Sequence, residues 1–473
     1  MAANQWQHAG MAAAPASLAG RARRKQRTHC AGLTPLAPFG TLVTQLRLFR
    51  SSTHSMRLSP LRTTIAALLA SAVLLAAGWL WLRPAGPLLR AAEFGLDALS
   101  PNADGVRDVT RITYRLARPA RVSISFLDES GRRFRFRSDN PRPSGEHQLL
   151  FSGIVAGFTL SDEEFEGQIL ARVLPDGDYT WIIEAAGGNE REELTGALTV
   201  AGVDSALPEM RGFSVSPPLF TPNRDGISDR VWVNMYLTKS AHVSVHLLDD
   251  AGNQRPIAER AGDIAPNEPG LHTFEYEGGV DLGVSPPPDG VYQVVALAED
   301  AVGQKTRVEG QLTMEHGGVP RADIVNAQVE FSDTTVVQGE RLEFTLTVEN
   351  YGAAPIRTSG PAPGFGYAQD ENANSFGWYE ESGAWRVGID CDTCIRDYPW
   401  RWALGTRDEL TRIGEHWYLM PGQRATVSGD VTITQIPARN PLYFWAGLIH
   451  EDVEVSNINN RVDPHFITIV PKD

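Results

Sequence analysis

The stretch LSPNADGVRD (residues 99–108) decides the fold, because a near copy, FTPNRDGISD, returns at residues 220–229. Both stretches share the pattern Pro-Asn-x-Asp-Gly-x-x-Asp. They lie in longer segments, 100–131 and 221–252, which align without gaps at a shift of 121 residues. Sequence repeats more than about 100 residues apart indicate duplicated domains rather than a solenoid of short repeats.

Each copy has the pattern of short strands separated by turns. RVSISFLD (121–128) and HVSVHLLD (242–249) alternate apolar with polar side chains, which is typical of half-buried strands. The later segments PDGDY and PDGVY place Pro, Asp and Gly in a turn before the strands YTWIIEA and YQVVALA. We therefore predict an all-β protein built of tandem antiparallel β-sandwiches.

Together, the Pro-Asn-x-Asp-Gly-x-x-Asp motif, the Leu-Asp turn, the Pro-Asp-Gly-x-Tyr motif and the closing strand resemble the FlgD/Vpr-type Ig-like domain. The resemblance covers residues 92–201 and 208–315, and it implies two Ig-like domains of a bacterial surface or secreted protein. The family's Trp-Asp-Gly motif is missing here, where LLFSGIVAG and FEYEGGVDLG stand instead. The middle of each domain therefore departs from the family pattern.

The repeated motif has two interpretations. Calcium takes six to eight oxygen ligands, and a flexible Gly lets nearby amide and carboxylate oxygens converge on such an ion. Calcium is thus the one cofactor that the sequence suggests, with other segments or water completing the shell. Alternatively, the same side chains form Asx turns that open each domain. The candidate calcium ligands are Asn102, Asp104, Asp108, Asn223, Asp225 and Asp229.

The N-terminal part predicts a membrane anchor. Residues 63–82 (TTIAALLASAVLLAAGWLWL) carry no charge and, as a helix, would span about 30 Å, the thickness of a bilayer core. Residues 1–62 are basic and are expected to be disordered in the cytoplasm, with the rest of the chain outside the cell. A cleaved signal peptide and a buried soluble helix are the alternatives, and translation starts at Met1 or Met56.

Charge excludes one class of partner. Residues 1–90 hold 11 of the 43 Lys and Arg and none of the 57 Asp and Glu, so the remainder has a balance of −25. Because nucleic-acid phosphates require a basic surface, we expect no nucleic-acid partner.

Residues 321–473 form the predicted third domain. VVQGERLEFTLTVENYG (336–352) resembles a CARDB-like Ig domain. Six of the 11 Trp fall within 378–445. Aromatic rings beside charged groups suit a glycan ligand, and the alternative is that these rings fill the core. The candidate ligand-binding residues are Trp378, Trp385, Trp400, Trp402, Trp417, Arg386 and Arg401.

Cys391 and Cys394 form a single CxxC motif, for which a local disulfide, a metal site and free thiols are the alternatives. Several carboxylates lie near the Trp residues in the sequence, and a pair of such groups is what a glycan-active enzyme would need. However, no GxSxG, HExxH or P-loop motif occurs in the chain. These carboxylates are Glu380, Glu381, Asp390, Asp392 and Glu415.

The sequence therefore predicts a single-pass membrane protein that is not an enzyme. Its Ig-like stalk would present a binding or adhesion domain to a glycan or an envelope protein. A purely structural envelope spacer is the alternative, and a glycan-active enzyme is the third class.

Overall fold

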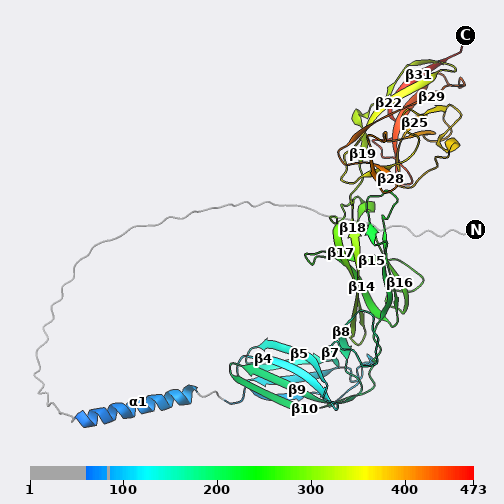
Figure 1. The fold of residues 1–473 in the computed structure, drawn as a ribbon. Coiled ribbons are helices and arrows are strands. Elements are labelled where there is room, and N and C mark those ends of the chain that lie inside the picture. The colour runs from blue at the N-terminus through cyan, green and yellow to red at the C-terminus, as the bar shows by residue number, and fades with distance from the viewer. Residues whose placement is uncertain (1–59, 83–85) are drawn as a thin grey trace, which may run out of the picture. The chain divides into compact units, whose positions relative to one another are not determined.

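The structure is a computed structural model that describes residues 60–82 and 86–473 (Figure 1). Helix α1 (Pro60–Leu82) belongs to a different compact unit from residues 84–473. Pro at the first helical position is favoured because its missing N–H would be unsatisfied there anyway. Within the described residues, no helix combines the length and apolar character needed to cross a membrane. This finding does not support the membrane segment expected at 63–82, and residues 1–59 lie outside the description.

The remainder of the described chain is almost entirely β-structure, which confirms the all-β prediction. Three separate hydrophobic cores define three domains, which we call domain 1, domain 2 and domain 3. Each domain consists of largely antiparallel strands around its own core.

Domain 1 packs a three-stranded sheet, β1-β3-β6, against a five-stranded sheet, β2-β10-β9-β4-β5. Along β3, buried residues alternate with more exposed ones, so one face points into the core. Phe94 stacks on Trp181 at 4.9 Å between ring centroids. The strands are β1 (Leu89–Phe94), β2 (Ala98–Leu99), β3 (Thr110–Leu116), β4 (Ala120–Asp128), β5 (Arg133–Arg142), β6 (Gly145–Phe151), β9 (Gly177–Gly187) and β10 (Glu190–Val200).

Domain 2 repeats the order of these strands, but its β15 pairs with both β14 and β16 and so joins the two sheets. Its β13 begins 121 residues after β3, and its β17 begins 113 residues after β9, which are the two shifts seen in the sequence. The described elements are β11 (Met210–Ser216), β12 (Leu219–Phe220), β13 (Val231–Leu237), β14 (Ala241–Leu248), β15 (Gln254–Glu259), β16 (Gly270–Tyr276), η1 (Val280–Leu282), β17 (Gly290–Asp300) and β18 (Lys305–Met314).

The two copies differ in the middle, where the family motif was missing. Domain 1 carries a hairpin, β7 (Ile154–Ala156) and β8 (Gln168–Val173), whereas domain 2 has the short η1. The hairpin also adds to the sheet of domain 2, because β8 pairs antiparallel with the start of β18, while Val155 of β7 stays in the core of domain 1. The junction between domains 1 and 2 is therefore a continuous β-sheet.

Domain 3 contains a β19-β22-β29-β24 sheet and a larger β21-β31-β30-β25-β23-β28-β27 sheet (Figure 1). The elements are β19 (Ala322–Ile324), η2 (Val325–Ala327), β20 (Glu330–Phe331), β21 (Thr335–Val337), β22 (Arg341–Asn350), β23 (Ile356–Thr358), β24 (Gly366–Ala368), η3 (Ala373–Phe376), β25 (Trp385–Cys391), β26 (Trp400–Ala403), β27 (Thr411–Ile413), β28 (His416–Leu419), β29 (Arg424–Thr432), β30 (Leu442–His450) and β31 (Val462–Val470).

Candidate functional site

The repeated motif of domain 1 is a network of turns. Both carboxylate oxygens of Asp108 accept backbone N–H groups: Oδ1 from Asn102 and Ala103 at 3.0 and 2.9 Å, and Oδ2 from Gly105 at 2.6 Å. The amide oxygen of Asn102 accepts from Asp104 N, and Asp104 Oδ1 accepts from Val106 N. The three backbone hydrogen bonds that Asp108 accepts, above all the one from Asn102, lower the pKa of its carboxyl group.

Residues 221–229 of domain 2 form the same network. Asp229 accepts from the backbone of Asn223, Arg224 and Gly226 at 3.0, 2.6 and 2.6 Å. Asn223 Oδ1 accepts from Asp225 N at 3.0 Å, as in domain 1. The Asx turns of the sequence interpretation are therefore present in both copies. Among the residues that the structure describes, no group of three or more His, Cys, Asp or Glu is placed to hold a metal ion, so calcium stays a prediction.

The surroundings of the two loops differ strongly. Asn223 and Asp225 are only 2% and 3% exposed, whereas Asp104 and Gly105 are exposed. Domain 3 covers the second loop: Tyr418 Oη donates to Asp225 Oδ2 at 2.9 Å, and His450 Nε2 lies 2.8 Å from the carbonyl oxygen of Arg224. The loop of domain 2 thus forms part of the joint with domain 3.

Burial at this joint shifts several pKa values. It raises the pKa of Asp225, and together with the charge of Asp225 it raises the pKa of Asp229 to about 6. Burial, reinforced by the charges of Arg224 and Arg357, lowers the pKa of His450 to about 4. His450 is therefore neutral at pH 7, and its ring stacks on Trp385 at 4.4 Å between centroids.

Four of the seven predicted ligand-binding residues are buried in the interior of domain 3. Trp385, Trp400 and Trp402 are 7%, 1% and 0% exposed. A ring with so little exposed surface cannot stack on a ligand from solvent, so the binding prediction is wrong for these three residues. They fill the core instead, where Trp402 Nε1 donates to the carbonyl oxygen of Phe365 at 2.8 Å.

Arg386 and Arg401 serve an internal ion network. Arg386 is 1% exposed and Glu451 is 3% exposed, and their side chains approach to 3.3 Å. Arg401 Nη1 contacts both carboxylate oxygens of Glu451 at 2.9 Å. Buried charges require such partners, because an unpaired one costs several kcal/mol. The prediction that these two arginines bind a ligand is therefore corrected for Arg386, which is enclosed.

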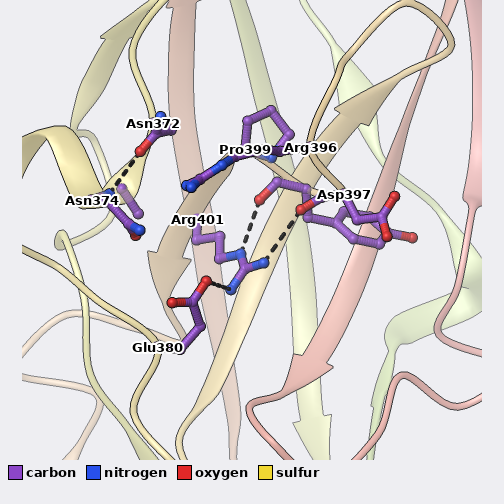
Figure 2. Close-up of a pocket in the computed structure, with 9 residues that line it drawn as sticks. Asn372, Asn374, Glu380, Arg396, Asp397, Pro399 and Arg401 are labelled. Atoms are coloured by element: carbon purple, nitrogen blue, oxygen red, sulfur yellow. Dashed lines mark hydrogen bonds and ion pairs between the residues drawn. The ribbon is translucent and has the colours of Figure 1, made fainter.

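Arg401 also borders a polar pocket of about 270 Å³ that Figure 2 shows. There its guanidinium donates to the carbonyl oxygens of Tyr398 and Asp397 at 2.9 and 3.3 Å and lies 3.9 Å from Glu380. The N–H groups of Arg401 are thus turned to partners within the protein, which leaves this pocket without a strong anion-binding group from Arg401 (Figure 2).

The two remaining predicted tryptophans come together in another pocket. Trp378 is 39% exposed and Trp417 is half-buried, and both line a cavity of about 370 Å³, which we call the Trp378 pocket. The guanidinium of Arg407 lies 5.9 Å from the ring centre of Trp417, within range of a cation–π interaction. Other side chains in its wall are Thr358, Ser359, Glu381, Leu410, Glu415 and His416.

Chain topology explains why the sequence revealed only part of this pocket. Trp417 lies on β28, which pairs with β23, so Thr358 stands opposite Trp417 in the sheet. Trp378 comes from the segment after η3, and Arg407 from the loop after β26. Trp417 stood out in the sequence as one of the six tryptophans within 378–445, whereas Ser359 and Arg407 had no such signal.

Three of the five candidate catalytic carboxylates have close partners within the protein. Glu381 binds the guanidinium of Arg357, and Asp392 lies 3.0 Å from Arg439. Asp390 is 7% exposed, and burial raises its pKa to about 6, while its Oδ1 accepts from Cys391 N at 2.8 Å. Cys391 and Cys394 are joined by a disulfide.

Comparison with known proteins gives no family assignment. No protein-family model matches the chain, and no curated protein matches it in sequence. Among solved structures, a tetra-tandem repeat from the extending region of a large adhesion protein aligns with 77% of this chain and 72% of its own, at 12% identity and a TM-score of 0.18. A 1.5-MDa bacterial ice-binding adhesin and the ICAM-5 D1–D4 ectodomain each align with 82% of this chain and with 99% and 78% of their own chains, both at 10% identity and a TM-score of 0.20. Superpositions this poor say nothing about the function of the chain.

Proposed function

We propose that this chain is a bacterial membrane-anchored surface protein whose third domain binds a glycan. The Trp378 pocket carries the proposal, because it is the place where the predicted tryptophans keep exposed ring surface. Ligand sites combine apolar walls with a few polar groups that fix orientation. Here the rings of Trp378 and Trp417 offer apolar faces to the C–H face of a sugar. Glu415 offers its carboxylate to the hydroxyls of the sugar.

The anchor in this proposal rests on the sequence of residues 63–82, which lacks charge over 20 positions. The surface location is supported by the disulfide, because such bonds persist mainly in oxidising compartments. The acidic balance of the domains is compatible with solubility outside the cell.

Isothermal titration of the full chain in detergent with a panel of neutral and acidic oligosaccharides tests the binding function. We expect at least one oligosaccharide to bind, and Trp378→Ala and Trp417→Ala each to weaken its binding about tenfold, which corresponds to a loss of about 1.4 kcal/mol of stacking on the ring. Trp232→Ala is the matched control, because Trp232 of domain 2 is 37% exposed but lies on β13, outside the pocket. Binding that survives both pocket substitutions would refute the proposed site.

A structural spacer is the second candidate function. It is favoured by the two junctions, one a shared sheet and the other the buried loop of domain 2. If no oligosaccharide binds and no envelope protein is retained by the immobilised chain, the spacer function is the better description.

A further inference from the structure

The loops at 99–108 and 220–229 present nearly the same backbone shape. Ala103 and Arg224 have φ of 64° and 59°, and Gly105 and Gly226 have φ of 86° and 82°. Their hydrogen bonds match as well. The bond from Asp104 N to Asn102 Oδ1 and the bond from Asp225 N to Asn223 Oδ1 are both 3.0 Å long. Two copies of one shape can fit one complementary surface.

The structure contains that complementary surface on domain 3. We call it the socket, and define it by Arg357, Ser382, Gly383, Tyr418 and His450. A Cβ atom on Gly226 would lie 2.2 Å from Ser382 O, and one on Gly383 would lie 2.1 Å from the carbonyl carbon of Asp225. The two backbones therefore meet without room for a side chain.

The loop atoms that contact the socket exist in both copies. His450 contacts a backbone carbonyl, that of Arg224, and Ala103 offers the same group. Tyr418 donates to the carboxylate of Asp225, and Asp104 carries the matching carboxylate. Nothing in these contacts requires a side chain that domain 1 lacks.

The charge distribution also suits the first loop. Arg357 in the socket is a positive neighbour of Asp225 and would be one of Asp104. Arg224 places a positive charge near His450, with its guanidinium 3.8 Å from Asp281, whereas domain 1 has the uncharged Ala103 at that position. In addition, Val106 is 63% exposed and corresponds to Ile227, which is half-buried in the docked loop, so docking would bury apolar surface.

We propose that the 99–108 loop of domain 1 docks into the domain 3 socket of a second copy of this chain. In one molecule the socket is filled by its own 221–229 loop, which a short tether holds at millimolar effective concentration. Association between copies therefore follows release of that loop. Because the contact joins different surfaces of the two copies, it is heterologous and extends into rings or filaments.

Two matched substitutions test the proposal in the full chain in detergent. Gly226→Asn introduces a Cβ that clashes with Ser382 and opens the socket, whereas Gly105 has no atom within 4 Å of its added Cβ. Asn tolerates positive φ, so both substitutions keep the turn. Light scattering after size-exclusion chromatography gives the protein mass at about 100 µM, a concentration at which a 10 µM contact is largely formed.

We expect the unsubstituted chain to be monomeric and Gly226→Asn to form dimers and larger species. Adding Gly105→Asn or Gly383→Ala to Gly226→Asn is expected to restore the monomer, the first by blocking the loop and the second by blocking the socket. A monomeric Gly226→Asn protein overturns the proposal. So does association that persists in the Gly226→Asn, Gly105→Asn double variant, because misfolding caused by Gly226→Asn would affect both proteins alike.

Discussion

At the scale of single residues, His450 shows how position changes chemistry. The imidazole lies 3% exposed between domain 2 and the core of domain 3, and its Nε2 faces a backbone carbonyl. Because its pKa is lowered to about 4, the native protein keeps it neutral at a pH where the unfolded chain protonates it. Its contribution to stability is therefore complete above pH 6.5 and falls as the pH drops toward 4.

His450→Gln removes this titration. Between pH 7.5 and pH 5, the unsubstituted chain should lose about 2 kcal/mol of unfolding free energy more than the variant does. Asp229, with its pKa raised to about 6, has the opposite slope between about pH 4 and 6, but it is common to both proteins and cancels. Denaturation followed by tryptophan fluorescence measures the difference. Equal pH dependence in the two proteins would contradict it, and His242→Gln, at an exposed position, is the control.

At the scale of elements, the β7–β8 hairpin belongs to both domains, because Val155 packs in the core of domain 1 and β8 pairs with the sheet of domain 2. Its β8 pairs with Lys305–Arg307 of β18, and Gln304 adds a buried side chain whose Nε2 donates to the carbonyl oxygens of Asp204 and Ala206. Gly167 lies at the point of closest approach, with φ of 98°.

Gly167→Ala should loosen this junction. The added Cβ would lie 2.3 Å from Arg307 O, at a φ that Ala adopts only with strain, so we expect a loss of about 2–3 kcal/mol. Hydrogen exchange of the amides in 168–173 and 305–307 measures the local opening. Gly188→Ala is the matched control, with φ of 61° and no atom within 4 Å, and it should leave those amides protected. Equal hydrogen exchange in the two variants would contradict the prediction, because backbone strain at positive φ, and not the clash with Arg307, would then explain the opening.

At the scale of the whole molecule, the distribution of charge separates a basic N-terminal part from acidic domains. Residues 1–90 contain no Asp or Glu, and residues 63–82 contain no charge at all. A basic flank on one side of an apolar segment directs that side to the cytoplasm. The proposed surface location follows from this asymmetry.

Fractionation of bacterial cells that express the full chain tests the anchor. The protein should sediment with membranes and resist extraction by alkaline carbonate, and externally added protease should digest the β-domains in intact cells or spheroplasts. A variant that lacks residues 60–82 should leave the membrane fraction. Recovery of the full chain in the soluble fraction would refute the anchor while leaving the glycan-binding proposal open.

The sequence by itself determined the duplication, the strands and the turns, because these depend on local alternation and on residues such as Gly105 and Asp108 that act within a few positions. Only the tertiary structure decided which copy of the repeated loop is buried and which tryptophan rings are buried. Asp225 and Tyr418 form a hydrogen bond although they are 193 residues apart in the sequence. This contact buries the loop of domain 2, whereas the matching loop of domain 1 is exposed. Likewise, Trp402 fills the core while Trp378 borders a pocket, although both lie in one aromatic segment. Burial depends on contacts between distant segments, and neither composition nor spacing encodes them locally.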